Sequence, residues 1–349
     1  MRTTIKDIAE YTGFSVTTIS LVLNGKGTKI PEKTKQIIFK AVEDLDYRPN
    51  QIAVGLVKKR TNTIGLIISD IRNVFFSNLA KGIEDECRRN GWNLVLCNTN
   101  DMHERDMAYI RVLADKGVDG ILYAMSIDSD HEKAMESLTL MDSIKIPYIM
   151  IDRTFRQKCC HYVVTDHEVG GYLATKHLTD LGHRRIACVT GPLHLDDSKF
   201  RLDGYRRALE EASIPYDPAL IYEGDYTVEG GREGINKLLS ETFTAVFAFN
   251  DMSAYGVYNV LKANGYNIPD DISLVGYDNI FFSELLDTPL TTIHQPIYEV
   301  GIEATKRLIE MNEKKPIDKL ERVIEPYLVV RKSTSAVKLE KTEANESVK

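Results

Sequence analysis

Polar side chains able to bind a small molecule stand directly after several apolar runs of this chain. Asp152 follows the run YIMI, Asn250 follows AVFAF, and Asp278 follows SLVGY. Arg201 lies near the start of a helical segment that comes after a further run of this kind. Carboxylates, an amide and a guanidinium each bind paired hydroxyl groups through directional hydrogen bonds. Gathered in one place, they would suit a hydroxyl-rich ligand.

Further residues of these kinds stand at comparable positions. The polar ones are Asp70, Asn73, Arg153, Asp251 and Asn279. Phe75, Phe76 and Tyr226 are aromatic residues near expected strand ends, where they could cover an apolar face of the ligand. An alternative is that the polar residues are helix caps and turn residues, because Asp and Asn are common at such positions.

The sequence lacks the motifs that would indicate catalysis. It contains no GxSxG, P-loop, HExxH or GxGxxG pattern. Its eight histidines are scattered, and the neighbours Cys159 and Cys160 are too close in sequence to chelate one ion together. We therefore expect no enzyme, no metal site and no cofactor.

Alternating strands and helices, beginning at residue 63, must position the polar residues. Apolar strand-like runs occupy 63–70, 92–99, 119–124, 147–152, 184–192, 220–226, 244–251 and 273–279. Helical segments lie between them, among them 75–91, 104–117, 170–182 and 199–214. The pattern predicts parallel sheets with helices on both faces, arranged as two similar lobes. Ligands of such sheets bind beyond the carboxyl ends of the strands, so the polar residues should meet between the lobes.

Residues 1–48 indicate a small, all-helical head instead. Thr4 is the expected N-cap of a first helix, and Gly13 ends that helix. Ser15 caps a second helix, whose apolar face is formed by Val16, Ile19, Val22 and Leu23. A third helix over 31–47 begins with Pro31 and is expected to bury Ile37, Ile38, Ala41, Val42 and Leu45.

Two short helices around a glycine turn, followed by a third helix, are typical of a helix-turn-helix. Such a unit places the start of its second helix in the DNA major groove. Ser15, Val16, Thr17, Thr18 and Leu21 lie there, with hydroxyls for phosphates or base edges and methyl groups for thymine. The alternative is a three-helix bundle that binds protein.

The charge distribution favours DNA as the partner of the head. Residues 1–62 hold eleven basic and six acidic residues, a net of +5, whereas the rest hold 33 basic and 45 acidic, a net of −12. Only the head is therefore suited to a polyanion. No apolar run is long enough to span a bilayer, and the N-terminus lacks the apolar core of a secretory signal, so we expect a cytoplasmic protein.

A short basic segment over 49–61 separates the head from the body. It contains Gly55 and is too short to be a stable helix alone. A hinge helix that folds only when two copies meet on DNA would have this composition, and Leu56 could then wedge between base steps from the minor groove. A flexible linker is the alternative. The polar segment 336–349 is expected to be a flexible tail.

Nearly the whole chain resembles the lactose-repressor (LacI/GalR) family of bacterial transcription regulators. The resemblance is carried by IKDIAEYTGFSVTTISLVLNG, YRPNQIAVGL, NTIGLIISDIRNVFFSNLAKGIE, HEVGGYLATKHLTDLGHRRIACVTGP, NDMSAYGVYNVLKANG, ISLVGYDN and PLTTIHQP. It implies a homodimer whose heads bind a pseudo-palindromic operator in double-stranded DNA, and it favours a repressor. It also implies a periplasmic-binding-protein-like body over 62–335 that binds a small sugar-like effector. The first lobe would comprise about 62–162 and 294–323, and the second about 163–293 and 324–335.

The resemblance also implies roles for individual residues. It places base reading on Val16, Thr17 and Leu21, and phosphate contacts on Ser15, Thr18 and Asn24. Thr4, Tyr47, Asn50, Ala53 and the minor-groove Leu56 complete the expected DNA contacts. The effector positions fall on Phe75, Phe76, Asp152, Arg201, Tyr226, Asn250, Asp278 and Gln295.

The chain departs from the family pattern at several places. Leu21 stands where many members have arginine, and Val54-Gly55 replaces the common Arg-Ser of the hinge. Leu195 stands where purine-responsive members carry an arginine, which disfavours a purine corepressor. The block from Tyr298 to Leu308 only loosely resembles that of regulators that bind a phosphorylated carrier protein.

Two other functions compete with a DNA-binding regulator. A solute-binding transport protein would share the two-lobed body, but the basic helical head and the absence of a signal peptide speak against it. A two-lobed enzyme is disfavoured by the missing catalytic motifs.

Overall fold

A computed structural model describes residues 3–47, 60–155, 160–316, 319 and 321–337. The chain divides into two compact units, Met1–Thr61 and Asn62–Lys349. The expected hinge contacts Asn50, Ala53 and Leu56, and most of the expected tail, lie outside the described residues.

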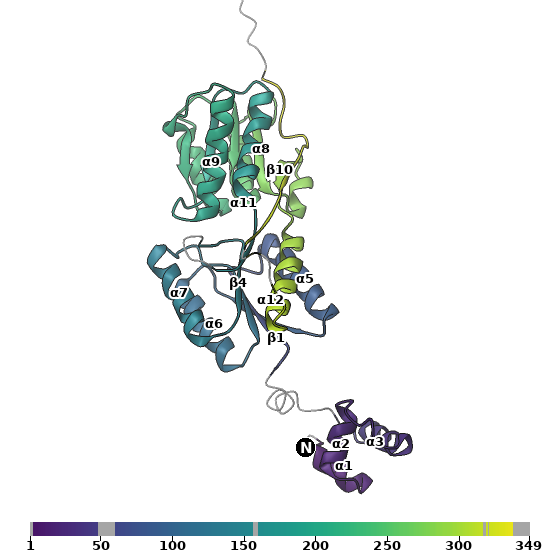
Figure 1. The fold of residues 1–349 in the computed structure, drawn as a ribbon. Helices are drawn as coiled ribbons and strands as arrows, with labels where there is room; N and C mark the ends of the chain where they lie inside the picture. Colours follow the sequence, from purple (N-terminus) through teal and green to yellow (C-terminus); the bar gives the residue numbers. More distant parts are fainter. Residues whose placement is uncertain (1–2, 48–59, 156–159, 317–318, 320, 338–349) are drawn as a thin grey trace, which may run out of the picture. The chain divides into compact units, whose positions relative to one another are not determined.

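In its described residues the first unit contains three helices, α1 (Ile5–Thr12), α2 (Val16–Leu23) and α3 (Glu32–Asp44) (Figure 1). They pack around a core of Ile8, Ile19, Val22, Ile38 and Ala41. Because these apolar residues recur at helical spacing, each helix can turn one face inward.

The first two helices begin and end where the sequence predicts. The backbone N–H of Thr4 donates to Asp7 Oδ2 at 2.7 Å, and Gly13 ends α1 with a left-handed φ of 74°. Ser15 Oγ accepts from the backbone N–H of Thr18 at 3.1 Å and so caps α2. These caps satisfy helix-end groups that would otherwise need water.

The third helix corrects several expectations. It begins at Glu32 rather than Pro31, which is its N-cap, and it ends at Asp44 rather than at 47. Ile37 is 44% exposed, since its neighbour Ile38 already points into the core and adjacent helical residues cannot share a face. Val42 and Leu45 are only half-buried. Val16, expected on the inner face of α2, is also exposed, at 40%.

The second unit holds two α/β lobes, each built on a six-stranded sheet. The first sheet has the order β11-β5-β4-β3-β1-β2, and all of its strand pairs are parallel. Its strands are β1 (Thr63–Ile68), β2 (Asn93–Asn98), β3 (Gly120–Tyr123), β4 (Tyr148–Ile151), β5 (Tyr162–Thr165) and β11 (Glu321–Ile324). This lobe confirms the predicted parallel sheet.

Helices cover both faces of the first sheet. They are α5 (Val74–Arg89), α6 (His103–Asp115), α7 (His131–Ile144) and α12 (Ile297–Asn312). Ile64, Leu66 and Ile68 of β1 pack with α5 and α12, whereas Ile67 packs with α6 and α7. Successive strand residues point to opposite faces of the sheet. Because both faces are covered, the strand must be apolar on both of them.

The second sheet has the order β12-β10-β9-β8-β6-β7. Its strands are β6 (Ile186–Thr190), β7 (Ile221–Glu223), β8 (Ala245–Ala248), β9 (Ser273–Asp278), β10 (Thr291–His294) and β12 (Tyr327–Val329). The edge strand β12 is antiparallel to β10, and the other pairs are parallel.

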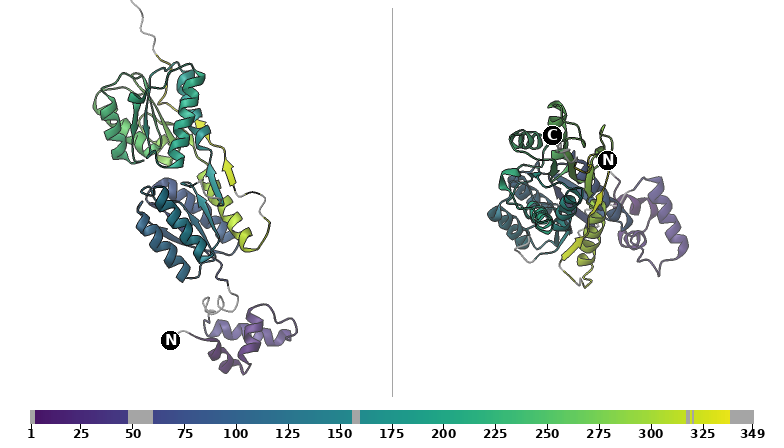
Figure 2. Two further views of the ribbon diagram at one scale, coloured as in Figure 1. Left: turned by 60° about the vertical axis from the view of Figure 1, so that its left-hand side comes forward. Right: turned by 90° about the horizontal axis from the view of Figure 1, so that it is seen from above.

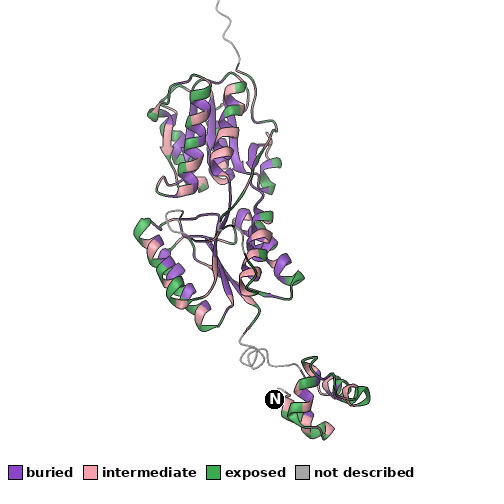
Figure 3. Ribbon diagram, viewed as in Figure 1, coloured by how far each residue is buried: buried purple, intermediate pink, exposed green. Residues whose placement is uncertain are grey.

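The helices of the second lobe again cover both faces of the sheet. They are α8 (His167–Asp180), α9 (Asp196–Glu211), α10 (Val228–Leu238) and α11 (Asp251–Ala263), with short 3-10 turns η1 (Pro218–Leu220) and η2 (Phe281–Glu284). One core lies under α8 and α9, and another lies under α10 and α11. Figure 3 shows the buried strands between helices whose outer faces are exposed.

The chain passes between the lobes three times, after β5, after β10 and after β11. Helix α12 therefore belongs to the first lobe although it follows most of the second along the chain (Figure 2). The lobe boundaries differ slightly from the expected ones. Residues 163–165 belong to the first sheet through β5, and Ile324 belongs to it through β11.

The start of the expected tail also needs correction. The backbone N–H of Val337 donates to the carbonyl of Leu181 at 3.0 Å, so residues 336 and 337 are part of the second lobe rather than of the tail.

Candidate functional site

A cleft lies between the two lobes. We call it the inter-lobe cleft. Its lining residues come from the ends of strands, the starts of helices and one crossover. They are Asn73, Phe75, Phe76, Asp152, Arg153, Asp197, Arg201, Tyr226, Asn250, Asp278 and Gln295.

Three of the lining residues have a strained backbone. Asp152, Tyr226 and Asp278 have φ values of 57°, 65° and 112°, in the region that favours glycine. Each follows a strand end or a turn at the cleft, and there the chain bends to aim a polar side chain inward. Strain of this kind persists where the surrounding structure holds it, and it concentrates at functional sites.

Arg201 is the central cation of the cleft. Its side chain is buried, and its guanidinium carbon lies 4.0 Å from the ring centroid of Tyr277 and 5.4 Å from that of Tyr226. Nη1 donates to the backbone carbonyl of Phe249. Nη2 lies 3.9 Å from Asp197 Oδ2. Aromatic faces and acceptors thus hold the planar cation in one orientation.

Tyr226 forms one wall of the cleft. Its hydroxyl donates to Asp197 Oδ2, and its backbone carbonyl accepts from Asn250 Nδ2 at 2.9 Å. Burial raises the pKa of Tyr226 well above its usual value, and Asp197 adds to this, so the phenol keeps its proton. A Cβ on Gly191 would lie 2.1 Å from the ring, and only glycine lets the ring approach this closely.

Arg153 contributes a second buried cation from the first lobe. Its Nη1 pairs with Asp101 Oδ1 and donates to the carbonyl of Met125 at 3.3 Å. Its guanidinium carbon lies 5.4 Å from the ring centroid of Phe76. The charge of Arg153 is therefore largely engaged within its own lobe.

Two buried oxygen atoms in the cleft have no hydrogen-bond partner among the described residues. They are Asp197 Oδ1 and Gln295 Oε1. Gln295 uses its amide nitrogen to donate to Asp278 Oδ1 at 2.7 Å, which leaves its oxygen unpaired. An unpaired buried acceptor costs about 1–3 kcal/mol, so both atoms are prepared for hydrogen-bond donors from a ligand or from water.

Burial shifts the pKa values of the cleft carboxyls upward. Loss of solvation raises the pKa of Asp152 to about 7, with Asp197 adding to the rise and Arg153 opposing it. Burial likewise raises the pKa of Asp278 well above its usual range, against the charge of Arg201. A raised pKa favours the protonated carboxyl, which can donate as well as accept hydrogen bonds.

The cleft as a whole is built to bind rather than to react. Three carboxyls and two guanidiniums line the cleft, and one of the guanidiniums, that of Arg153, already pairs with Asp101. Acceptors and donors surround the space, and Phe75, Phe76 and Tyr226 offer aromatic faces. Directional polar groups with aromatic faces suit a polyhydroxylated ring.

The structure brings all eight residues of the predicted effector set into this cleft. Asn73 and Arg153, expected only as polar residues at strand ends, line it as well. Asp197 was missed. The signal was its position four residues before Arg201, which places the two on one face of a helix.

Other polar residues at strand ends do not line the inter-lobe cleft. Asp70 pairs with Arg72 on the surface, which lowers its pKa. Asp251 instead accepts hydrogen bonds from Ile280, Ser283 and Thr292 inside the second lobe. For these residues the alternative reading, a capping or structural role, is the better description.

The residues expected to read bases lie on the surface of the head. Val16 and Leu21 are each 40% exposed, and Thr17 is exposed. Ser15 and Thr18 bond each other through their hydroxyls at 2.8 Å. Asn24 Nδ2 donates to the carbonyl of Ser20 at 2.7 Å, while Tyr47 packs partly against the core.

No helix in the described part of the chain is long and apolar enough to cross a membrane. Within the same residues, no cluster of three or more His, Cys, Asp or Glu side chains is placed to hold a metal ion.

A helix-turn-helix head joined to a two-lobed α/β body with a polar cleft defines a class of ligand-responsive DNA-binding proteins. Residues 4–50 match the family of bacterial regulatory proteins of the lacI type. Residues 61–326 match the periplasmic binding proteins and sugar-binding domain of the LacI family. The chain belongs to the LacI family, and it is a DNA-binding transcriptional regulator rather than an enzyme.

Similar proteins cover almost the whole chain. The transcriptional regulator DegA of Bacillus subtilis is 40% identical over 336 residues, covering 96% of this chain and 99% of DegA. The transcriptional repressor PurR of Vibrio parahaemolyticus is 39% identical over 330 residues, covering 94% of this chain and 97% of PurR.

Solved structures agree with this assignment. The lac repressor dimer bound to operator and the anti-inducer ONPF matches with a TM-score of 0.87 and 27% identity, over 96% of this chain and all of that one. A LacI-family regulator of Enterococcus faecium with bound ribose matches with a TM-score of 0.70 and 35% identity. The match covers 79% of this chain and 100% of that one. The regulator CelR in complex with cellobiose matches with a TM-score of 0.72 and 28% identity. The match covers 95% of this chain and 100% of that one.

Proposed function

We propose that this regulator is a homodimeric repressor that binds a pseudo-palindromic operator and releases or tightens it when a sugar-like effector occupies the inter-lobe cleft. The observation that carries the proposal is the convergence of Asp152, Arg201, Asn250 and Asp278 from separate elements on one cleft. Such convergence would be accidental if these residues were only caps and turns.

A sugar-like effector is supported by the chemistry of the cleft. The unpaired oxygens of Asp197 and Gln295 await donors, which hydroxyl groups supply. The Tyr226 ring and the T-shaped pair of Phe75 and Phe76, with centroids 5.2 Å apart, offer apolar faces for the carbon side of a ring. Similar regulators have been solved with ribose and with cellobiose.

DNA binding is assigned to the exposed start of α2. Val16, Thr17 and Leu21 would contact base edges, and Ser15, Thr18 and Asn24 would contact phosphates. Thr4, Tyr47, Asn50, Ala53 and Leu56 complete the proposed DNA set. Because Leu21 is apolar, its expected partner is a thymine methyl rather than a guanine.

A homodimer is supported by an exposed apolar patch on the second lobe. Phe281, Phe282 and Leu285 are 59%, 51% and 61% exposed and lie in and beside η2. Three large apolar side chains in one short segment are costly in water and would be covered by a partner. Two heads held together also fit a two-fold symmetric operator. We place the protein in the bacterial cytoplasm, where operator DNA lies.

A gel-shift experiment with effector titration tests the proposal. Operator fragments selected from a random DNA pool should bind the full chain, and a saccharide that raises the melting temperature should change that binding. At 100 times its dissociation constant, such a ligand adds about 2.7 kcal/mol to stability. Affinity for DNA should fall steeply with salt because residues 1–62 of each chain carry a net charge of +5.

The same experiment separates the competing functions. A transport-type protein would bind saccharide and show no specific DNA binding. A flat dependence of DNA affinity on salt, or saccharide binding that leaves DNA affinity unchanged, would contradict the proposal.

A further inference from the structure

A further pocket lies between the lobes. We call it the outer chamber. The first lobe supplies Met125, Ser129, Asp130, His131, Thr154 and Phe155, and the second supplies His194, Leu195, Asp196 and Lys199. None of these residues belongs to the lining of the inter-lobe cleft.

The outer chamber adjoins the inter-lobe cleft. Arg153 lines the cleft and the next residue, Thr154, lines the chamber, just as Asp197 lines the cleft and Asp196 the chamber. Arg153 also donates to the carbonyl of Met125, a chamber residue. The cleft and the chamber are therefore lined by neighbouring residues in both lobes.

The chamber contains an unsatisfied buried polar group. The hydroxyl of Ser129 is buried, with the residue only 2% exposed, and it has no hydrogen-bond partner among the described residues. A lone buried hydroxyl costs stability unless something pairs with it. This is the feature that points to a ligand.

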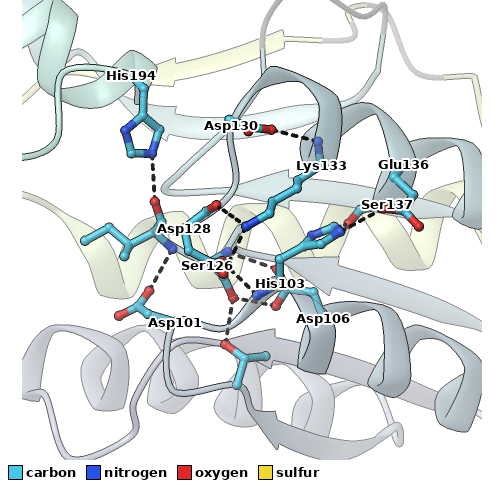
Figure 4. A network of polar contacts seen from close by, with 12 residues as sticks. Asp101, His103, Asp106, Ser126, Asp128, Asp130, Lys133, Glu136, Ser137 and His194 are labelled. Atoms are coloured by element: carbon cyan, nitrogen blue, oxygen red, sulfur yellow. Dashed lines mark hydrogen bonds and ion pairs between the residues drawn. The ribbon is translucent and has the colours of Figure 1, made fainter.

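The loop that carries Ser129 is fixed by a dense polar network (Figure 4). Asp106 accepts from the backbone N–H and the hydroxyl of Ser126 at 3.1 and 2.8 Å. Asp101 accepts from the N–H of Ile127 at 3.0 Å, and Asp128 accepts from the N–H of His103 at 2.8 Å. Because the loop is held at each of these residues, the Ser129 hydroxyl is preorganised.

The walls of the chamber favour an uncharged ring. Leu195 is buried, and the rings of Phe155 and His131 pack edge to face with centroids 4.8 Å apart, which gives apolar surface. Asp130 and Asp196 supply two carboxylates against one lysine, Lys199, which does not favour a phosphate group. Hydroxyl groups, by contrast, can donate to these carboxylates and to Ser129.

We propose that the effector consists of two linked sugar rings, the first in the inter-lobe cleft and the second in the outer chamber, where the Ser129 hydroxyl binds it. The inference rests on the proposed sugar-like effector and specifies that the effector has two rings. Leu195 then serves as an apolar platform for the second ring.

Calorimetric titration of the full chain with matched saccharides tests this inference. The probes are glucose against cellobiose and maltose, galactose against lactose, and glucose 6-phosphate. One disaccharide should bind at least tenfold more tightly than its own monosaccharide. Ser129→Ala should weaken that disaccharide about five- to tenfold and leave the monosaccharide unchanged.

Matched variants separate this role from a structural one. Removing a hydroxyl without a partner should not lower the melting temperature, so Ser129→Ala is expected to fold normally. Ser143→Ala, at the other end of α7, removes an exposed hydroxyl bonded to Leu140 and serves as control. Lys199→Ala, at a half-exposed side chain, is the second chamber variant and should also weaken only the disaccharide.

Each outcome supports or overturns the two-ring effector. Equal affinity for a monosaccharide and its disaccharides, or a Ser129→Ala variant that binds both as the unaltered protein does, overturns the two-ring effector and leaves the sugar-like effector standing. Tighter binding of glucose 6-phosphate than of any disaccharide overturns it as well. If no saccharide binds, the proposed effector class and the two-ring inference fall together.

Discussion

His194 of the second lobe donates a hydrogen bond from Nε2 to the backbone carbonyl of Ile127 in the first lobe, over 2.8 Å. The bond spans the two lobes directly (Figure 4). Its acceptor belongs to the loop that Asp101 and Asp106 hold in place, so this end of the bond is fixed to the first lobe. The bond therefore stabilises the lobes in this relative arrangement.

Replacing His194 should change the effector-free conformation. His194→Ala removes the donor, so the balance of lobe arrangements should shift toward a more open form. Small-angle X-ray scattering of the effector-free protein should show a larger radius of gyration. His194→Gln retains a donor and should behave as the unaltered protein; an unchanged radius in the alanine variant would mean that the bond has no conformational role.

Arg201 should be required for the response to effector. We expect Arg201→Ala to abolish that response while operator affinity without effector stays nearly intact, because the head is a separate unit. Titrating effector into the variant–operator complex measures this. Arg201→Lys, which keeps the charge but not the planar fork, should bind effector at least tenfold more weakly. A normal response in either variant would remove Arg201 from the site.

Asp152 should make stability depend on pH. Its pKa is about 7 in the folded protein, above the ordinary value of 3.8, so the folded state binds this proton more tightly than the unfolded state. The contribution is complete below about pH 4 and is lost as pH rises through 7, at a cost of about 4 kcal/mol.

Urea unfolding between pH 4 and pH 8 checks this sign. Asp152→Asn, which keeps the neutral shape, should lose less stability over that range than the unaltered protein. Asp70→Asn is the control, because Asp70 has a lowered pKa and lies outside the cleft. Parallel curves for the unaltered protein and Asp152→Asn would show that Asp152 is ionised throughout.

Leu56→Ala should weaken specific DNA binding far more than non-specific binding. A leucine wedge opens the minor groove only at a deformable central step, so its loss removes specificity. Competition between operator and random DNA measures both affinities. An equal loss for the two would make Leu56 an ordinary packing residue of the hinge.

Phe281→Asp should convert the proposed dimer to a monomer. The change places a charge in the exposed apolar patch with Phe282 and Leu285, and its burial at an interface would cost several kcal/mol. Sedimentation velocity gives the association state. Val330→Asp, another exposed apolar residue of the second lobe, is the control and should remain dimeric. A dimeric Phe281→Asp would place the interface elsewhere.

The sequence predicts most of the cleft because parallel sheets bring the carboxyl ends of their strands to one edge. Asp152 and Asp278 could be found from strand ends alone, and resemblance supplied Gln295 in a crossover. Asp197 could not be found this way, since its role comes from the helical register of α9 relative to Arg201. The outer chamber depends on two loops from different lobes, which no local pattern brings together.

Short and polar elements limited the prediction of the fold. Strand β11 is mostly exposed and carries Glu321 and Arg322, so it shows none of the apolar run expected of a buried strand. It forms because the edge of β5 offers unpaired backbone groups. In the head, the adjacent Ile37 and Ile38 could not both be buried, and only packing against α1 and α2 selects one of them.

The crossovers have a consequence for synthesis on the ribosome. The first lobe is completed by α12 and β11, which follow nearly all of the second lobe along the chain. Until α12 (residues 297–312) has emerged, Ile64 and Leu66 lack its cover, and until residue 324 has emerged β5 presents an open edge. The nascent first lobe therefore exposes apolar surface and an unpaired strand edge while the second lobe is being made. A chain released near residue 290 would be prone to aggregate.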